Sequence, residues 1–486
     1  MSTVAALITI VLAIAAVILV WRPPSTLSRH LGAGAPHAPA LRATVTAVAG
    51  ATALAAAVVV ASGTHDDTNV AYAIDALRPS VLGQDSWAPM LTAAQELEAH
   101  SGSDIYEAVF FEGGVKFQYP VMSLVLAAPL LTALEWTDQQ VFDAANAACW
   151  VCFLLLGGTV GLIFLRALAR ATSRSAPYSW PARLCAIAGG TAATFLYFPV
   201  TRGLELGQIQ TAMTLAAALA LLAWQHDRPW IAGALIGLCC VVKPHWGILV
   251  LWALLRGRWQ FAAGAAAVAV PLTIVSVAVY GFDNVIAYVD VARALSVSGE
   301  SYFPNQSFNG LANRFFDNGP NLVFDPIGLP SEHAGVRTIT LVTTVAILGA
   351  CLAWRTQRPP TAVELSLVMV SLTIAAPVAW EHHYGVLLPV FAAAAPAIAR
   401  RRPWGRASVP LLAFAYALTS VTLFPIVNRT AETPANVLQS YMLAGGLLLL
   451  VTLYRLSWVE RRGYGLAGRP PMPVTSSPSS ASPLLR

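Results

Sequence analysis

The stretch ALITIVLAIAAVILVW, residues 6–21, is almost wholly apolar and shows no alternation of polar and apolar positions. A strand of a membrane β-barrel would alternate over about 10 residues. A helix needs about 20 mainly apolar residues to cross a hydrocarbon layer of roughly 30 Å. The stretch therefore predicts a membrane-spanning helix. Because no basic segment precedes it and no small-residue cleavage site stands before Arg22, we expect it to be retained and not removed as a signal peptide.

Apolar runs of this kind recur along all 486 residues, of which 57% are hydrophobic and 11% are charged. A soluble protein carries about 25% charged residues, so a water-facing fold is excluded. The sequence predicts an all-α polytopic membrane protein, a helix bundle with about 12–13 spans and large extracytoplasmic loops. The expected spans are residues 4–21, 43–61, 119–134, 141–165, 184–199, 208–224, 231–255, 260–280, 336–354, 364–380, 384–399, 408–427 and 438–457.

Basic residues gather in short loops such as 256–258 and 400–406, which the positive-inside rule assigns to the cytoplasm. The net charge of +5 lies mainly in these loops, so it indicates orientation and not nucleic-acid binding. The segments then expected outside are residues 62–118, 281–335 and 428–437.

Strict alternation of the spans also places the arginines between residues 166 and 183 outside, against the positive-inside rule. One alternative is that segment 119–134 is re-entrant, with a compensating break at Lys243-Pro244. The other is that these arginines face lipid headgroups on the outer side. The sequence leaves both open.

The sequence gives no sign of several common chemistries. It contains no G-x-x-x-x-G-K-[ST], G-x-S-x-G or H-E-x-x-H motif, which argues against ATP hydrolysis, an α/β-hydrolase nucleophile and a metalloprotease. All six cysteines lie in apolar segments, where cysteine usually packs as a small residue, so C-x-x-C at Cys149 and Cys152 is not expected to be redox-active or metal-binding. We therefore expect neither a metal nor another cofactor.

The first outer loop carries Asp85 at the start of an amphipathic pattern that runs to Leu97. This pattern predicts a short interfacial helix with its apolar face toward the membrane. The loop continues through "SGSDIYE" to "FQYP", residues 117–120. A carboxylate in a polar loop is usually only solvated, and composition alone does not select one.

Two further segments carry charge inside or between apolar runs. "FPVTRGLELGQIQTAM" contains Arg202 and Gln208, and its glycines also fit a simple turn between helices. Lys243 lies within a long apolar run, where a lysine costs roughly 2.5–3.5 kcal/mol unless it pairs, snorkels or serves function. Either an anion partner or a snorkelling lysine beside the Pro244 kink fits this position.

Two polar motifs lie on the expected outer side. "EHHY" places Glu381, His382, His383 and Tyr384 where a span meets the surface, although one glutamate and two histidines are a poor zinc site. "SYFPNQSFNGLANRFFDN", residues 301–318, is richer in amide and aromatic groups than a connector requires. We expect it to be a binding surface.

Taken in order, these segments resemble the membrane-integral GT-C glycosyltransferases, and more closely glycosyltransferase family 87. The elements that carry the resemblance are an outer-loop Asp followed by "DIY" and "YP", then "GQ", "KP", "NQSFNGLANR" and "HHY". They extend over about residues 85–390. The family includes mycobacterial polyprenol-phosphate-mannose-dependent α-mannosyltransferases and an arabinofuranosyltransferase.

The resemblance implies a role for each matching residue. Asp85 is the expected general base. The expected donor-phosphate ligands are His382, His383, Lys243 and Arg202. The expected sugar- or acceptor-binding residues are Tyr106, Tyr119, Gln208, Asn305, Gln306, Asn309, Asn313, Arg314 and Tyr384.

The chain also departs from the family pattern. The usual Tyr-Pro-Pro is Tyr119-Pro120-Val121 here, and roughly twenty additional residues separate the preceding span from Asp85. Asp66 and Asp67 are therefore rivals for the catalytic role. By the same resemblance, residues 1–42 form an additional span and a basic inner loop. The remaining expected divisions are a GT-C catalytic module at 43–335, C-terminal helices at 336–458 and a disordered Pro/Ser-rich cytoplasmic tail at 459–486.

The expected activity is inverting transfer of a sugar, with mannose preferred, from a polyprenyl-phosphate donor to a lipid-linked or cell-envelope glycan. The expected location is the outer face of a bacterial cytoplasmic membrane. The alternatives are an arabinofuranosyltransferase of the same family, a flippase or transporter of lipid-linked glycans, and an inactive scaffold of the same fold.

Overall fold

The computed structural model describes residues 3–21, 38–63, 69–78, 82–100, 102, 104–125, 136–173, 176, 178–354, 360–400 and 405–467. Over these residues the chain is helical and has no β-strand, which confirms the all-α prediction. The longer helices are α1 (Thr3–Trp21), α3 (Ala38–Ser62), α5 (Trp87–Ala99), α7 (Asp138–Ala171), α8 (Trp180–Phe195), α10 (Gln210–Gln225), α11 (Pro229–Val242), α13 (Trp259–Tyr280), α14 (Phe282–Val297), α16 (Ala334–Ala353), α17 (Ala362–Ala375), α18 (Leu387–Arg400), α19 (Gly405–Ser420) and α21 (Tyr441–Ala467). The shorter elements are α4 (Asn69–Asp75), η2 (Tyr106–Glu112), η3 (Val121–Ser123), α9 (Phe198–Glu205), η4 (Pro244–Trp246), α12 (Gly247–Leu254), α15 (Phe308–Phe315), η5 (Glu381–Val386), α20 (Phe424–Val427), η6 (Asn428–Thr430) and η7 (Pro434–Ser440).

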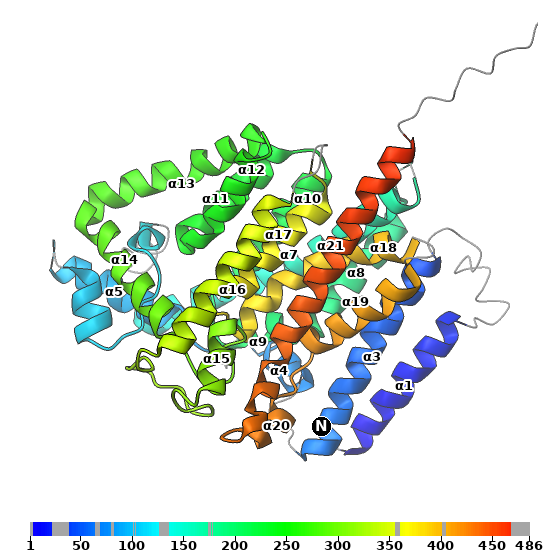
Figure 1. Ribbon diagram of the computed structural model, residues 1–486, viewed down its shortest axis with the longest axis horizontal. Helices are drawn as coiled ribbons and strands as arrows, with labels where there is room; N and C mark the ends of the chain where they lie inside the picture. Colours follow the sequence, from blue (N-terminus) through cyan, green and yellow to red (C-terminus); the bar gives the residue numbers. More distant parts are fainter. Residues whose placement is uncertain are drawn as a thin grey trace, which may run out of the picture.

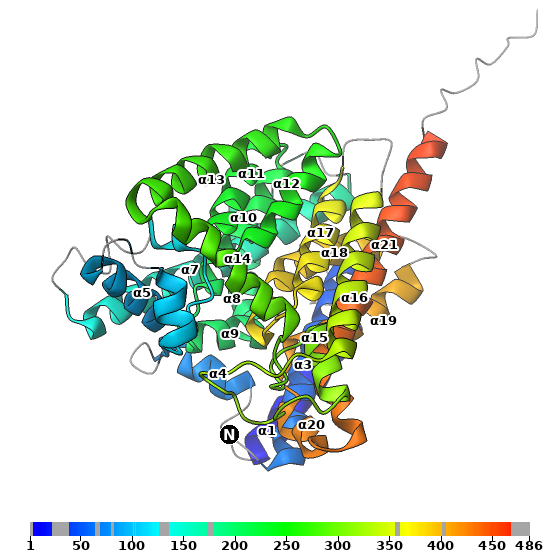
Figure 2. The same cartoon turned by 60° about the vertical axis from the view of Figure 1, so that its left-hand side comes forward.

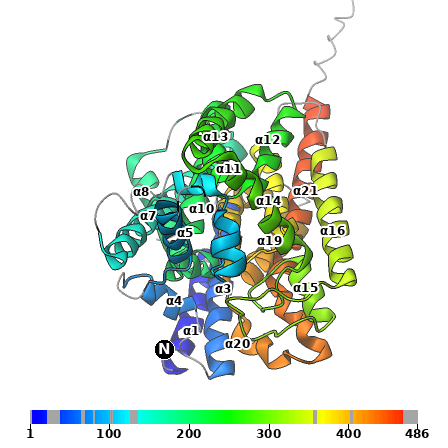
Figure 3. The same ribbon diagram turned by 90° about the vertical axis from the view of Figure 1, so that its left-hand side faces the viewer.

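The helices form a bundle whose two ends differ. The short helices α4, α15 and α20 gather at one end, and α12 and the C-terminal end of α21 lie at the other (Figure 1). Helix α14 leads from α13 toward α15 and packs against η2 (Figure 2). Helix α1 packs against α3 beside the rest of the bundle (Figure 3).

By length and composition, six of the described helices are able to cross a membrane, or up to eight if each of two bent helix pairs is one span. This agrees with a polytopic membrane protein, but fewer helices pass this test than the 12–13 spans that we expected. Helix α17 shows one reason, because its 14 residues are fewer than the roughly 20 that a straight crossing needs, and every one of them is buried in the protein. Apolar composition does not distinguish a helix that faces lipid from one that is surrounded by other helices.

The described residues before and after the expected span 119–134 lie at the same end of the bundle. Gln95 lies before this segment and donates from Nε2 to Oδ1 of Asp138, which lies after it, at 3.4 Å. The chain therefore leaves and returns at the same end of the bundle. Residues 126–135 of this segment lie outside the described residues.

The expected span 231–255 is broken at Lys243. Helix α11 ends one residue earlier, and Pro244 begins a 3-10 turn because proline has no backbone N–H to continue the helix. Lys243 itself has an extended backbone, with φ −138° and ψ 96°. The polar side chain thus lies at a break and not within a continuous helix.

Helices α11 and α13 run in the same direction. Gly233 approaches the backbone of Phe261, and Gly237 approaches that of Ala265. Residue numbers therefore increase in the same direction along both helices. The chain between them must run back through α12. Residues 229–254 therefore form a re-entrant hairpin whose tip carries the lysine.

These two features remove the conflict over the arginines. Arg170 donates from Nη2 to the Gln225 carbonyl oxygen at 2.6 Å, where α10 ends and α11 is about to begin. Because α11 and α13 start at the same end of the bundle, Arg170 lies at the same end as the basic turn 256–258. The structure therefore favours the alternative in which these arginines share the side of the basic turn.

The predicted helix after Asp85 is present as α5, but its environment differs from the prediction. Its buried face includes Trp87, Met90 and Leu91, and the Trp87 indole donates to Asn146 Oδ1 of α7 at 3.0 Å. The apolar face therefore packs on protein and not on the membrane.

At the other end of the chain, α21 continues to Ala467, past the expected start of a disordered tail.

Candidate active site

The segment that carries Asp85 is fixed to the start of α10 by backbone contacts. Residues 83–86 run alongside residues 205–207, and the Asp85 N–H donates to the Leu206 carbonyl oxygen at 3.0 Å. Gly207 has φ +66°, and a Cβ there would collide with the carbonyl oxygen of Gly83. The glycine of the "GQ" motif is therefore required for this close approach.

A short polar network orients the Asp85 carboxylate. Gln208 donates from Nε2 to Asp85 Oδ2 at 2.6 Å, and its Oε1 accepts from Ser86 Oγ at 2.8 Å. The Tyr119 hydroxyl lies 2.8 Å from the same Ser86 Oγ. The amide is thus held so that its N–H₂ group faces the carboxylate.

Two opposing influences act on the pKa of Asp85. Surrounding protein raises its pKa above the ordinary value, while the hydrogen bond from Gln208 and the charge of Arg202 lower it. The raising influence is the larger. The carboxylate nevertheless remains accessible from the cavity described next, as a proton acceptor must be.

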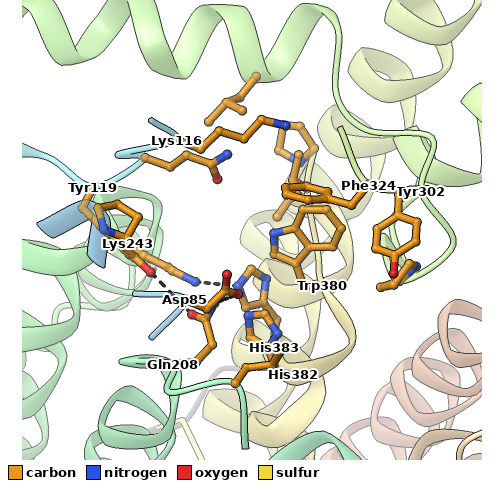
Figure 4. A pocket seen from close by; sticks show the side chains of 18 of the residues that line it. Asp85, Lys116, Tyr119, Gln208, Lys243, Tyr302, Phe324, Trp380, His382 and His383 are labelled. Carbon is orange, nitrogen blue, oxygen red and sulfur yellow. Dashed lines mark hydrogen bonds between the residues drawn. The ribbon is translucent and has the colours of Figure 1, made fainter. Parts of the chain in front are cut away.

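These groups line one cavity of about 710 Å³ together with side chains from distant parts of the chain (Figure 4). Its polar lining includes Asp85, Lys116, Gln118, Tyr119, Arg202, Gln208, Lys243, His245, Glu381, His382 and His383. Its apolar and aromatic lining includes Tyr288, Leu295, Tyr302, Phe324 and Trp380. The size suits a ligand larger than a single small ion.

Lys243 reaches this cavity from the tip of the re-entrant hairpin. Its Nζ lies 2.6 Å from His383 Nε2 and donates to Gln210 Oε1 at 3.0 Å. Neither partner carries a fixed negative charge. The cation is therefore oriented by the protein but is not neutralised by these two contacts.

Arg202 is engaged by carboxylates. Its Nε donates to Glu381 Oε1 at 3.0 Å, and its Nη1 forms an ion pair with Glu205. The guanidinium also lies over the Tyr72 ring at 5.2 Å. Arg202 lines the cavity, but its charge is already compensated in part.

Next to this ion pair, three buried polar atoms have no hydrogen-bond partner among the described residues. They are both ring nitrogens of His382 and Oε2 of Glu381. Leaving a buried polar group unpaired costs about 1–3 kcal/mol, so such groups in a cavity wall indicate a ligand site. The histidine nitrogens are the atoms in this group that are able to donate to an anion.

The cavity brings together seven of the residues expected from the sequence: Asp85, Tyr119, Arg202, Gln208, Lys243, His382 and His383. It does not bring in Tyr106, Asn305, Gln306, Asn309, Asn313, Arg314 or Tyr384, all of which are buried outside its lining. Asp66 and Asp67, the expected rivals of Asp85, lie outside the described residues.

The expected amide side chains and Arg314 of the amide-rich stretch are buried, although Tyr302 of the same stretch lines the cavity. Asn305 Oδ1 accepts from the Ala379 N–H at 3.0 Å, and Gln306 Nε2 donates to the Gln439 carbonyl oxygen at 2.7 Å. Arg314 Nη2 donates to the Asn305 carbonyl oxygen at 2.9 Å. The expectation that these side chains line the sugar site is corrected, because they instead satisfy backbone groups of a buried loop.

Asn309 and Asn313 belong to the same buried structure, since Asn313 Nδ2 donates to Asn309 Oδ1 at 2.8 Å. Two expected tyrosines likewise hold backbone groups. Tyr106 donates to the Tyr119 carbonyl oxygen at 3.0 Å, and Tyr384 donates to the Gln306 carbonyl oxygen at 2.5 Å. These side chains hold the backbone next to the site, but they do not line the cavity.

The expectations from sequence did not name the aromatic and basic part of the lining, which is Lys116, Tyr302, Phe324 and Trp380, although Tyr302 lies within the stretch 301–318 that was expected to bind. Lys116 stands just before "FQYP" and Trp380 just before "EHHY", so their nearness to the motifs was an available signal. Phe324 had no such signal, because it comes from the middle of an irregular loop.

The sequence pattern of glycosyltransferase family 87 matches residues 117–379, which is more than half of the chain. The chain belongs to glycosyltransferase family 87. Asp85, His382 and His383 lie outside the matched range, so their roles depend on the geometry described above.

Two curated relatives of this family 87 member are similar over most of their length. A polyprenol-phosphate-mannose-dependent α-(1-2)-phosphatidylinositol mannoside mannosyltransferase of Mycolicibacterium smegmatis is 28% identical over 69% of this chain and 74% of its own. A polyprenol-phosphate-mannose-dependent α-(1-2)-phosphatidylinositol pentamannoside mannosyltransferase of Mycobacterium tuberculosis is 26% identical over 71% of this chain and 73% of its own. As a family 87 member, the protein is a membrane glycosyltransferase.

Proposed function

We propose that the protein transfers a mannosyl residue from polyprenyl-phosphate mannose to a glycolipid or other envelope glycan, with inversion at the anomeric carbon. The choice of mannose over arabinose is supported by the two curated relatives, both of which depend on polyprenol-phosphate mannose. The observation that carries the proposal is the unpaired His382 imidazole in a cavity wall that also presents Lys243.

Asp85 acts as the general base. Its carboxylate takes the proton of the acceptor hydroxyl while that oxygen forms a bond to the anomeric carbon. The bond from this carbon to the phosphate oxygen breaks, and the electron pair leaves with polyprenyl phosphate. Gln208 holds the carboxylate toward the cavity during this step.

The departing phosphate gains negative charge, which the cavity offsets. Lys243 and His383 are 2.6 Å apart and present one oriented cationic site, and His382 adds one N–H donor that has no partner among the described residues. Preorganised donors of this kind contribute more to a transition state than to a ground state, because the charge develops only as the bond breaks. Arg202 holds Glu381 and so keeps the segment of both histidines in place.

The lipid donor explains why the site lies in a membrane bundle. Lys116 and Tyr302 line the cavity from the segments 62–118 and 281–335, which the positive-inside rule assigns to the outer side. Polyprenyl phosphate keeps its chain in the bilayer, so donor and site meet without a nucleotide-binding domain. We infer that the protein acts at the outer face of a cell membrane.

A direct test is transfer by purified protein from radiolabelled polyprenyl-phosphate mannose to a phosphatidylinositol mannoside in mixed micelles. Wild type should place the label on the acceptor, and Asp85→Asn should abolish transfer because an amide cannot accept the proton. Asp290→Asn is the matched control, since this exposed carboxylate of α14 lies outside the cavity lining.

Three results would contradict parts of the proposal. Full activity of Asp85→Asn, with loss in the double variant Asp66→Asn, Asp67→Asn, would move the base to that earlier pair. Transfer only from polyprenyl-phosphate arabinose would change the sugar. Movement of the labelled donor across vesicles without any labelled acceptor would indicate a flippase.

A further inference from the structure

Three aromatic side chains form a wall on one side of the cavity (Figure 4). Tyr302 comes from the loop between α14 and α15, Phe324 from the loop between α15 and α16, and Trp380 from the segment after α17. The ring centroids lie 5.8 Å apart for Tyr302 and Phe324, 5.9 Å for Phe324 and Trp380, and 6.4 Å for Tyr302 and Trp380. The three rings are therefore one continuous surface, which we call the aromatic wall.

The aromatic wall is not an ordinary part of the hydrophobic core. Phe324 is 38% exposed, and Tyr302 and Trp380 are only partly buried, whereas core aromatics such as Phe117 are fully buried. Keeping apolar ring surface open to a water-filled cavity is unfavourable. A ligand that covers the rings would remove this cost.

Polar groups border the wall. Lys116 Nζ lies 4.3 Å from the centre of the Phe324 ring and 3.6 Å from a carboxylate oxygen of Glu300. Gln118 lines the cavity from the same irregular segment of the loop. The wall thus offers a flat apolar face, and its border offers a cation and an amide.

A pyranose ring matches this arrangement. One face of the ring carries C–H groups with partial positive charge, which complement the negative face of an aromatic ring. Its edge carries hydroxyl groups that pair with amide and charged side chains. A pocket of mixed aromatic and convergent polar groups is the usual form of such a site.

We propose that the aromatic wall binds the sugar ring of the acceptor. This inference depends on the proposed function, in which Lys243, His382 and His383 take the donor phosphate. In Figure 4, Asp85 lies next to Lys243 and His383, and the wall extends from Trp380 away from them. An acceptor ring on the wall would direct a hydroxyl toward Asp85 from the side not taken by phosphate.

The backbone fixes the wall relative to the phosphate site. Trp380 forms an isolated antiparallel bridge with Asn305, and the Glu381 N–H donates to the Pro304 carbonyl oxygen at 3.0 Å. His382 follows two positions later on the same short segment. Because Trp380 and His382 belong to one short segment, its backbone sets the distance between the proposed acceptor and donor sites.

Acceptor and donor kinetics test this assignment. Trp380→Ala and Phe324→Ala should each raise the KM for phosphatidylinositol mannoside by roughly tenfold, the factor that corresponds to one lost aromatic contact. The KM for polyprenyl-phosphate mannose should stay within about twofold, and Trp380→Phe should restore most of the acceptor affinity. Phe315→Ala, which removes a 66% exposed ring of the same outer loop away from the cavity, is the matched control.

Saturation-transfer NMR with methyl α-mannoside and the full-length protein gives a second readout that needs no turnover. Signal should be present for wild type and Phe315→Ala and should be lost for Trp380→Ala. A raised donor KM with an unchanged acceptor KM, or equal NMR signal in all variants, would overturn the proposal. If wild type transfers no mannose, the proposed function fails, and the NMR comparison still decides whether the wall binds a sugar.

Discussion

Gln208 donates from Nε2 to Oδ2 of Asp85 at 2.6 Å, while its own Oε1 accepts a hydrogen bond from Ser86 at 2.8 Å. The second contact fixes the direction of the amide, so the first contact always presents a donor to the carboxylate. A donor favours the ionised form, which the surrounding protein disfavours. Gln208 therefore opposes the rise in the pKa of Asp85 that burial produces.

The first prediction concerns the pH dependence of transfer. Because the base must be ionised, the rate should fall as the pH drops through the pKa of Asp85, which lies above the ordinary value of about 3.9. Gln208→Leu removes the contact that lowers this pKa, so the acid limb of the pH–rate profile should move to higher pH. Gln95→Leu, which changes an exposed amide of α5, should leave the limb in place. An acid limb that is unchanged in Gln208→Leu, or that moves to lower pH, would show that Gln208 does not lower the pKa of the base.

The second prediction separates stability from activity at His382. Its ring nitrogens are buried and have no partner among the described residues, so His382→Leu removes an unpaired polar group and should raise the melting temperature. Transfer should fall by about 10²-fold, since one donor to the leaving phosphate is lost. Polyprenyl phosphate should stabilise wild type against heat more than the variant. A lower melting temperature with unchanged transfer would show that His382 only supports packing.

The third prediction concerns the Arg202–Glu381 pair, whose Nε and Oε1 are 3.0 Å apart. Arg202→Gln leaves a buried carboxylate without its cation and should cost about 3–5 kcal/mol of stability. Adding Glu381→Gln should recover most of this loss, because two amides can pair without net charge. Arg78→Gln is the control, since its ion pair with Asp75 is exposed and 4.0 Å long. A double variant as unstable as Arg202→Gln would mean that the charge pairing is not the cause.

The fourth prediction concerns the amide-rich stretch. Asn305→Ala deletes one acceptor for Ala379 and one donor to Glu300, leaving buried backbone groups unpaired, and should cost about 1–3 kcal/mol in thermal unfolding. An exposed amide such as Gln95 should cost under about 0.5 kcal/mol when changed to alanine. Equal melting temperatures for the two variants would return the stretch to the role of an exposed binding loop.

The sequence singled out several polar residues that line the cavity, because charge is conspicuous in an apolar chain. Asp85, Lys243 and the His382–His383 pair each stood out against their neighbours, and all four line the cavity. Motif order along the chain was enough to group them. No measurement of distance was needed for that step.

The amide side chains of the amide-rich stretch were predicted to bind a sugar, and that prediction failed for a physical reason. Asparagine and glutamine serve equally well to bind a ligand and to satisfy backbone groups of a buried loop, and composition does not distinguish these uses. The aromatic wall was missed for the converse reason. Phe324 and Trp380 look like ordinary apolar residues until the fold leaves their faces open to a cavity.

Topology was the other point where sequence was insufficient. Segments 119–134 and 231–255 are apolar enough to cross a membrane, and hydropathy counts each as one crossing. Whether such a segment spans or turns back depends on its neighbours. Gln95 meeting Asp138, and α11 running parallel to α13, are facts of the fold and not of either segment alone.

The re-entrant hairpin at Lys243 also bears on how the chain is inserted during synthesis. A segment that turns back adds no crossing. With one such turn before α7 and another at residues 229–254, only the helices between the two turns run in the direction opposite to the one that simple counting assigns. Everything after α13 keeps the sidedness that simple counting assigns, while α7 to α10 are inverted. A reporter fused near residue 175 should therefore lie on the same side as the basic loops. Lys243 is synthesised well before η5, which carries its partner His383.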